Sequence, residues 1–362
     1  MFINGRLGFS LVFLAVFVAA APAQTPSLPT PPSTDHPVTN QPTNDMIDLD
    51  VVVTPKSGPP VSGLQQQDFT ILDNKVPQTI LSFRAVRERE TLIEVVLVID
   101  DVNTGIANIA YERSELDKYL RTDGGHLAHP VALAFLADSG LKLQNDFSSD
   151  GNALSGALDQ YSLGLHSILR SGGIYSAMER FQVSMDALLQ LATHEAARPG
   201  RKMIVWISPG WPILSGPSVE QQMSAKQEQQ IFENVVKIST LLREGRVTLY
   251  SIDPLGSADF GGRGFRWEAY TKGISKQNQA EWGNLALQVI ATQSGGLALT
   301  TGNDITAYVK QCVADAQSYY EIAFTPALDQ KRDEYHHLEV HMADRKLMAR
   351  TRQGYYSNPS LQ

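Results

Sequence analysis

Cysteine is almost missing from this chain of 362 residues, because Cys312 is the only one. A single cysteine excludes an internal disulfide framework and a cysteine-rich zinc or iron–sulfur site. Cys312 lies between Val309 and Val313 in a segment with helical spacing, so we predict a buried and inert thiol. Basic charge is also scarce, since 30 Lys and Arg stand against 38 Asp and Glu. The net charge of −8 argues against nucleic acid as a partner, because phosphate binding needs a basic face.

Long apolar runs are limited to the N-terminus. Leu7–Ala20 follows the positive Arg6 and precedes Ala21-Pro22-Ala23, a small-x-small cleavage pattern. Residues 1–23 are therefore predicted to be a secretory signal peptide, because a run of about fourteen residues is short for a spanning anchor. Residues 24–45 are rich in Pro, Thr and Ser, which is typical of a flexible leader. We expect an exported protein (periplasmic, cell-surface or secreted) with no transmembrane segment in its mature chain.

Catalytic motifs are missing as well. There is no G-x-S-x-G, and His194-Glu195 lacks the second histidine of H-E-x-x-H. The loop Gly261–Gly264 lacks the Lys-Ser/Thr ending of a phosphate loop. His337, Glu339 and His341 would share one face of a strand and could ligate zinc, but a solvated strand face is the interpretation we favour. We expect that the protein is not an enzyme.

Two kinds of order fill the rest of the chain. Residues 46–90 and 316–358 alternate like strands, and neither segment is long enough to bury its own apolar face. We predict that they join into one small β-sandwich-like module. Residues 91–315 alternate between apolar strands and amphipathic helices, which predicts an α/β, doubly wound, mostly parallel, Rossmann-like sheet inserted into that module. Strands are expected at 93–99, 130–136, 141–147, 201–207, 247–252 and 297–300, and helices at 175–193, 219–244, 282–293 and 304–317.

The predicted strands carry motifs in a characteristic order. These are Val95–Asp100 followed by Asn103-Thr104, then Arg201–Gly210, then Leu249–Pro254, and near the end Ser294-Gly295-Gly296. In these motifs the sequence resembles a von Willebrand factor A (VWFA) domain, and more closely the VWFA-related family described from acidobacteria. The resemblance implies a VWFA-like domain over residues 91–315, with a binding surface for a protein partner at the carboxyl ends of the strands.

The resemblance also implies a metal-ion-dependent adhesion site, with Asp-x-Ser-x-Ser in its first loop. Asp100 matches the aspartate and Thr104 the second serine, whereas Val102 replaces the first serine. Ser171 is a candidate for the threonine of the second loop, and Ser208-Pro209 stands where the third loop should supply an aspartate. The site is degenerate, with Asp100, Thr104 and Ser171 as candidate ligands of Mg²⁺ or another divalent cation. The alternative is that Asp100 and Thr104 only cap and tie their own loop.

The loop near position 100 is expected to face outward and to contact a protein partner. The candidate contact residues are Asp100, Asp101, Asn103, Thr104 and Trp211. We therefore expect an exported, non-enzymatic binding or adhesion-type protein that uses the strand-end loops of its VWFA-like domain. The alternative is a structural or scaffold module of a cell-envelope assembly with no working ion site.

Two more residues near these loops have a structural interpretation. Trp206 lies inside an apolar strand and is expected in the core. Asp253-Pro254 directly follows a strand and is expected to start a turn. Trp211 could be exposed for a partner, but packing in the core or at its rim is the interpretation we favour.

Overall fold

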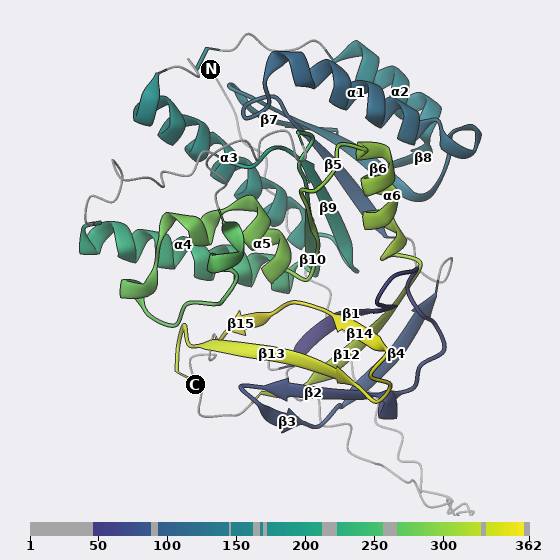
Figure 1. Ribbon diagram of the computed structural model, residues 1–362, viewed down its shortest axis with the longest axis vertical. Helices are drawn as coiled ribbons and strands as arrows, with labels where there is room; N and C mark the ends of the chain where they lie inside the picture. The colour runs from purple at the N-terminus through teal and green to yellow at the C-terminus, as the bar shows by residue number, and fades with distance from the viewer. Residues whose placement is uncertain are drawn as a thin grey trace, which may run out of the picture. The chain divides into compact units, whose positions relative to one another are not determined.

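The computed structural model describes residues 46–87, 93–144, 146–161, 167–168, 172–211, 223–255, 266–326 and 331–357 (Figure 1). The predicted signal peptide and leader, the candidate ligand Ser171 and the Gly261–Gly264 loop lie outside these residues. No helix among the described residues is long and apolar enough to cross a bilayer.

A mostly parallel sheet forms the centre of the described chain, in the strand order β11-β10-β9-β5-β6-β7, with β8 paired to β6. Strand β5 pairs in parallel with β6 and β9, and β10 pairs in parallel with β9 and β11, whereas β7 and β8 run antiparallel to β6. The strands are β5 (Glu94–Asp100), β6 (His126–Ala137), β7 (Gly140–Leu143), β8 (Ser148–Asp150), β9 (Lys202–Ile207), β10 (Val247–Ile252) and β11 (Ala298–Leu299).

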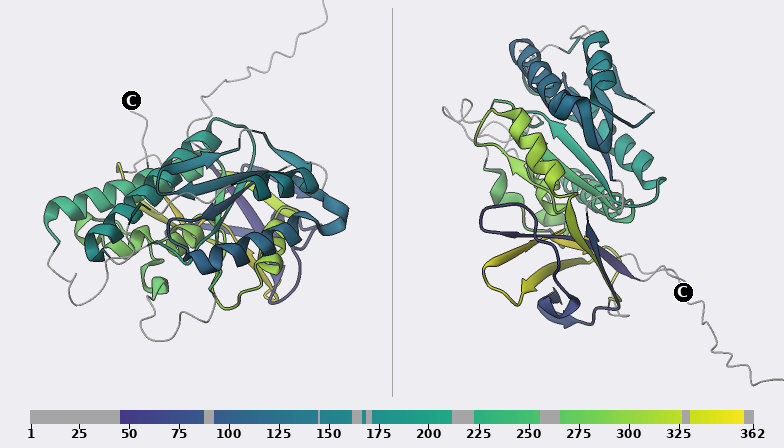
Figure 2. Two further views of the ribbon diagram at one scale, coloured as in Figure 1. Left: turned by 90° about the horizontal axis from the view of Figure 1, so that it is seen from above. Right: turned by 90° about the vertical axis from the view of Figure 1, so that its right-hand side faces the viewer.

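Helices cover both faces of this sheet (Figures 1 and 2). They are α1 (Ile106–Leu120), α2 (Gly151–Gln160), α3 (Gly173–Ala196), α4 (Ala225–Glu244), α5 (Leu287–Gln293) and α6 (Ile305–Ala314). Short 3₁₀ turns lie at Gln66–Asp68, Thr122–Gly125, Trp267–Tyr270, Gln277–Gln279 and Trp282–Leu285.

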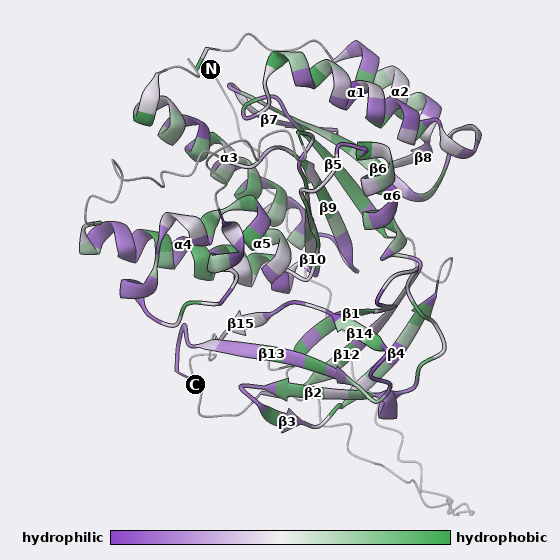
Figure 3. Cartoon of the chain, in the orientation of Figure 1, coloured by the Kyte–Doolittle hydropathy of each residue, from purple (hydrophilic) through white to green (hydrophobic). Residues whose placement is uncertain are grey.

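The two faces of β5 show why its sequence is a continuous apolar run. Val96 and Val98 belong to one buried cluster, which also contains residues of α3, α4 and α5. Val95, Leu97 and Ile99 belong to a second cluster with residues of α1, α2 and α6. A strand buried on both faces has no reason to alternate polar with apolar residues, and β5, β6 and β9 are accordingly mostly green in Figure 3, apart from the polar residues at their starts.

The helix boundaries depart from the sequence-based expectation in two places. The predicted helix over 282–293 is a 3₁₀ turn at Trp282–Leu285 followed by α5, because Ala286 between them has an extended backbone (ψ 142°). Helix α4 begins after Ser224, whose side chain accepts from the Gln227 N–H in a capping box. The part of the predicted 219–244 helix before residue 223 lies outside the described residues.

Two antiparallel sheets contain strands from both chain ends, in the orders β14-β1-β12-β4 and β15-β13-β2-β3. Strand β1 pairs with β12 and β14, and β2 pairs with β13. A third apolar cluster draws residues from both sheets, among them Leu49, Ile71 and Tyr320. The chain is thus mixed α/β, with a mostly parallel central sheet and additional antiparallel sheets. The strands are β1 (Ile47–Pro55), β2 (Phe69–Asp73), β3 (Val76–Gln78), β4 (Ser82–Arg87), β12 (Ser318–Phe324), β13 (Tyr335–Met342), β14 (Leu347–Arg350) and β15 (Gly354–Tyr356).

A buried polar group ties the two ends together inside the second of these sheets. Asp73 at the end of β2 contacts His336 Nδ1 on β13 at 2.9 Å, and the Tyr355 hydroxyl of β15 donates to its other oxygen at 2.7 Å. The His336 and Tyr355 rings are stacked with centroids 4.8 Å apart. Because all three side chains are buried, each depends on the others for its hydrogen bonds.

Ion pairs join the antiparallel strands to the elements of the central sheet, and residues 44–362 form one compact unit. Arg246, in the turn before β10, donates to Asp50 of β1 and to Glu321 of β12. Arg350 of β14 pairs with Asp315, which follows α6. These are partly or largely buried contacts, so breaking one partner leaves a charge with little solvent to stabilise it.

The Asp73 group gives a direct test of how the two ends are held. Asp73→Ala removes the acceptor for both His336 and Tyr355, so we expect the free energy of unfolding to fall by about 2–3 kcal/mol. Tyr355→Phe removes one hydrogen bond and should cost about 1 kcal/mol. Urea unfolding of the three proteins measures both values, and a loss below about 0.5 kcal/mol for Asp73→Ala would contradict the proposed tie.

Candidate functional site

The order in which the chain adds strands to the central sheet reverses between β5 and β9. The chain leaves β5 towards β6 on one side, and β9 is followed by β10 on the other side. In open α/β sheets, ligands bind outside the carboxyl ends of the strands at such a switch point. The two segments that meet there are Asp100–Gly105 after β5 and Ser208–Trp211 after β9. We call this region the carboxyl edge.

Asp100 is the central polar residue of the carboxyl edge, and its carboxylate is fully buried. The backbone N–H of Asn103 donates to Oδ1 at 2.9 Å, and the Asn103 amide donates to Oδ2 at 2.8 Å. The Trp206 indole N–H on β9 donates to Oδ2 at 3.1 Å. Burial raises the pKa of Asp100, and the donors from Asn103 and Trp206 offset part of that rise.

Asn103 extends the same network to the helix that covers this end of the sheet. Its amide also donates to the Ser184 hydroxyl of α3 at 2.9 Å, and Ser184 donates in turn to the Arg180 carbonyl at 2.9 Å. The network thus connects the loop after β5, strand β9 and helix α3. It fixes the loop by hydrogen bonds rather than by a bound group.

The expectation that this loop faces outward is wrong for its side chains. All five candidate contact residues are buried, with exposed fractions of 8% or less. They are Asp100 (0%), Asp101 (2%), Asn103 (8%), Thr104 (0%) and Trp211 (4%). The polar side chains of the loop point inward, where Asp100 and Asn103 bond to each other and Asn103 bonds to α3.

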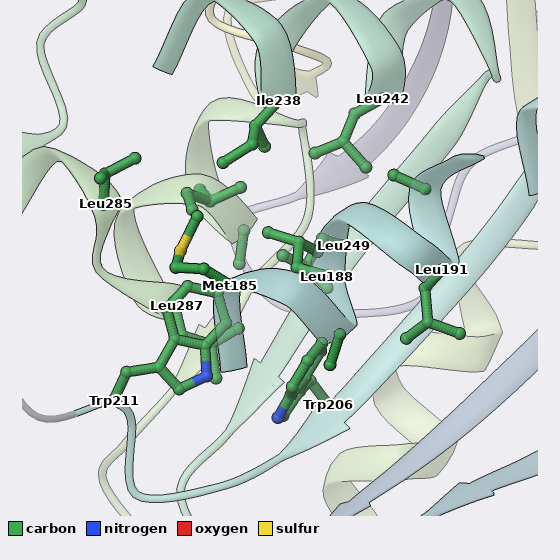
Figure 4. Close-up of a cluster of buried hydrophobic side chains, with 14 of the residues drawn as sticks. Met185, Leu188, Leu191, Trp206, Trp211, Ile238, Leu242, Leu249, Leu285 and Leu287 are labelled. Atoms are coloured by element: carbon green, nitrogen blue, oxygen red, sulfur yellow. The ribbon is translucent and has the colours of Figure 1, made fainter. Parts of the chain in front are cut away.

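Trp211 lies in the core rather than at an exposed rim (Figure 4). Its ring packs edge-on against Trp206, with centroids 5.5 Å apart, and against Phe181 of α3 at 6.4 Å. The favoured interpretation of Trp211 as a packed residue is therefore confirmed, and the expected core position of Trp206 is confirmed as well, since it is fully buried. The two indoles fill the space between β9 and α3.

The donor set at the carboxyl edge does not fit a Mg²⁺ site. Both oxygens of Asp100 already accept hydrogen bonds from the protein. Val102 offers no oxygen, Ser208 stands in place of the third-loop aspartate, and Ser171 lies outside the described residues. Across the residues that the structure describes, no group of three His, Cys, Asp or Glu could hold a metal ion. The interpretation that Asp100 ties its own loop agrees with this geometry.

A buried carboxyl that sequence reasoning missed lies beneath the loop. Glu112 of α1 is fully buried, and its two oxygens accept no hydrogen bond of good geometry from the described residues. Burial raises the pKa of Glu112 well above its usual value; the Thr104 hydroxyl lowers it somewhat, while the charges of Asp100 and Asp101 raise it further. Its helical position, on the same face as Ile109 and Leu116, is the sequence signal that could have revealed it.

The exposed side chains at this edge are apolar, and the sequence analysis did not single them out. Ile106 at the start of α1 is 64% exposed, and at the start of α3 Ile174 is 46% and Tyr175 85% exposed. Helix α1 starts directly after the Asp100 loop. Helix α3 runs from the carboxyl-edge side of the sheet to the Arg198–Glu94 pair at the beginning of β5, and its first turn lies about 15 Å beyond Ser184, the residue that contacts the loop. The sequence signal that could have revealed these residues is the apolar residues that directly follow glycine, in Gly105-Ile106 and Gly173-Ile174.

The remaining predictions about individual residues can be checked directly. Cys312 is buried and burial raises the pKa of its thiol well above the usual value, as expected for an inert cysteine. Asp253 accepts from the Leu255 N–H at 2.9 Å, which confirms the predicted turn. His337 and His341 are largely exposed and both lie near Glu339, with the closer nitrogen–oxygen distance 2.9 Å. That is the solvated strand face we favoured over a zinc site.

Comparison with known proteins gives only distant similarities. No family model matches the chain and no curated protein matches its sequence. Among solved structures, the open pilus adhesin SpaC from Lactobacillus rhamnosus GG is 9% identical (TM-score 0.38), with 81% of this chain and 48% of that chain covered. The manganese-loaded Plasmodium vivax TRAP protein is 10% identical (TM-score 0.35; 76% and 97% covered), and the SpRpn10 VWA domain is 11% identical (TM-score 0.31; 62% and 97% covered).

This chain also covers 49% of proximal thread matrix protein 1 from the mussel byssus, at 11% identity and a TM-score of 0.36. It thus spans about half the length of both the mussel protein and the adhesin. The fold assignment rests on the strand order and helix placement described above, and not on these similarities.

The two tryptophans form a matched pair for testing the Asp100 network. Trp206→Phe removes the indole donor to Asp100, whereas the Trp211 indole N–H has no acceptor among the described residues. Both changes lose similar packing, so their difference reports the hydrogen bond. We expect Trp206→Phe to lower the free energy of unfolding by about 1–3 kcal/mol more than Trp211→Phe. Equal losses in urea unfolding would contradict the role given to Trp206.

Glu112 predicts a particular dependence of stability on pH. Because its pKa in the folded protein is raised, its protonated form adds stability that is complete below the unfolded pKa and is lost as the pH rises through the folded pKa. Glu112→Gln cannot ionise, so it should gain stability relative to the wild type as the pH rises from 5 to 9. The exposed Glu179→Gln is the control. If the stability difference between Glu112→Gln and the wild type does not change with pH, the prediction is wrong.

Proposed function

We propose that this chain is an exported, non-enzymatic binding protein, in which a VWFA-like domain over residues 91–315 contacts a protein partner through its carboxyl edge. The observation that supports this most directly is the exposure of Ile106, Ile174 and Tyr175 at that edge. Export remains an inference from residues 1–23, and the absence of a catalytic constellation remains an inference from the sequence.

Exposed apolar side chains at a ligand-binding edge favour a protein partner over a small polar ligand. Single exposed apolar residues are common on protein surfaces, and Val76, Leu81 and Met348 are exposed elsewhere, so the support comes chiefly from the neighbouring pair Ile174 and Tyr175. Tyrosine is among the residues that contribute most to protein–protein binding energy, and Tyr175 is the most exposed large apolar side chain among the described residues. We therefore assign the contact to the starts of α1 and α3.

The polar residues that we first assigned to the contact have a different role in this proposal. The hydrogen bonds among Asp100, Asn103 and Trp206 hold the loop that leads into α1, and Asn103 bonds to Ser184 of α3. The network is thereby attached to the loop before α1 and to the middle of α3, where Ser184 lies. A fixed surface loses less conformational entropy on binding than a loose one. Binding is expected to be independent of divalent ions, because the oxygens of Asp100 are already in use.

The two antiparallel sheets complete the proposal. We infer that residues 46–90 and 316–358 form one β-sandwich-like module that connects the VWFA-like domain to the leader at 24–45. The ion pairs of Arg246 with Asp50 and Glu321 support a firm connection between the two parts. The same ion pairs support the alternative of a structural module in a cell-envelope assembly, in which firm attachment matters and the carboxyl edge does not.

Capture from an envelope extract of the source organism separates these functions. Residues 24–362 on a resin should retain a partner, and the Ile174→Ser, Tyr175→Ser double variant should retain at least tenfold less, because the apolar contact is lost. Addition of EDTA should leave capture by the wild type unchanged. Retained proteins are measured by quantitative mass spectrometry.

Met348→Ser is the matched control, because Met348 is 50% exposed on β14, away from the carboxyl edge. It should capture as much partner as the wild type. Equal capture by the wild type and the double variant would reject the carboxyl edge as the contact and favour the scaffold function. Loss of capture in EDTA would reject the proposed independence from metal ions.

A further inference from the structure

A small cavity lies between α4, α5 and the segment that joins β14 to β15. Its volume is about 20 Å³, which is room for a water molecule or an ion of similar size. Aliphatic side chains of α4 and α5 form part of its wall. Its polar lining consists of Ser239, Asn284, Gln293, Ser294 and Arg352, none of which is acidic.

Arg352 is a buried cation that forms no salt bridge with any described residue. Its side chain is 8% exposed, and among the described residues its guanidinium makes one long hydrogen bond, to the Leu242 carbonyl at 3.4 Å. The like charge of Arg243 disfavours its charged form and the negative charge of Asp50 favours it, but no carboxylate among the described residues forms a salt bridge with the guanidinium. Burial lowers the pKa of Arg352 to about 10, so the side chain still carries its charge at neutral pH. A buried charge left unpaired is costly, so its remaining N–H groups need an acceptor.

Two of the other polar groups around the cavity have donors to spare, whereas the Ser294 hydroxyl already donates to the Ala291 carbonyl and the Gln293 amide to the Thr271 carbonyl. The Asn284 side-chain oxygen accepts from the Glu281 N–H at 2.8 Å, which leaves its NH₂ group free to donate into the cavity. The Ser239 hydroxyl makes no hydrogen bond within the described residues. The carbonyl at the C-terminal end of α4 compensates only one of the five N–H donors of Arg352.

We propose that this cavity binds a single halide-sized inorganic anion, with chloride as the abundant candidate. The anion accepts from the Arg352 guanidinium, the Asn284 amide and the Ser239 hydroxyl. It neutralises the charge of a residue that comes from the C-terminal strands and enters the space between α4 and α5. Its binding therefore stabilises the attachment of those strands to the central sheet, independently of any partner at the carboxyl edge.

Anion-dependent melting and bromide diffraction test this site. Residues 24–362 contain the whole compact unit and are melted in sodium gluconate, chloride and bromide at one ionic strength. We expect a saturable rise of about 2 °C at ten times the dissociation constant of the halide. Crystals soaked in bromide should show an anomalous peak beside the Arg352 guanidinium. Identical melting in the three salts, or a water molecule in place of the bromide peak, would overturn the proposal.

A carboxylate placed in the cavity should replace the ion. Asn284→Asp keeps the acceptor for the Glu281 N–H and gives Arg352 a permanent counter-charge, so its melting temperature should no longer respond to chloride or bromide. The surface change Asn278→Asp adds the same charge outside the cavity and should keep the full halide response. A halide response that persists in Asn284→Asp would also overturn the proposal, and if that variant does not fold, the bromide peak in the wild type decides.

Discussion

The hydrogen bond from the Trp206 indole to the Asp100 carboxylate crosses the point where the strand order of the sheet reverses, and the rest of the site depends on it. It joins the ends of β5 and β9 at the position where open α/β sheets have their ligand-binding crevice. Since the same carboxylate accepts two further bonds from Asn103, three of its roughly four acceptor positions are used within the protein. This geometry agrees with the interpretation that Asp100 ties its own loop.

Because the loop after β5 is held by its own hydrogen bonds, the exposed apolar side chains near it come from helices α1 and α3. Polar groups of the loop are used internally, while Ile106, Ile174 and Tyr175 remain in contact with solvent. Charged groups are also used internally at the opposite end of the central sheet, where Arg246 forms ion pairs with Asp50 and Glu321. In both places charged and amide groups hold neighbouring elements in position.

Much of the fold could be predicted from the sequence, because its strongest signals are local. The continuous apolar runs at 93–99 and 201–207 predicted strands covered on both faces, and β5 and β9 are such strands. Helices α1 and α2 were not predicted. The buried face of α1 includes Glu112 and Glu115, and no side chain caps its first turn, so neither an apolar stripe nor a cap marks it clearly.

The site could be located but not interpreted from the sequence. The order of strands and helices placed the edge after β5 and β9 correctly. The buried carboxylate of Asp100 accepts a hydrogen bond from the Trp206 indole, which lies 106 residues further along the chain, and no local sequence pattern predicts that contact. The same holds for Arg352, whose surroundings come from α4 and α5 and whose lack of a salt bridge with any described residue is visible only in three dimensions.

The pairing of β1 with β12 limits the order in which the chain can fold. Ile47 lies opposite Phe324, so the first strand has no hydrogen-bonding partner until nearly all of the polypeptide has been synthesised. Contacts between such distant positions form slowly, and an unpaired apolar strand is an aggregation hazard while it waits.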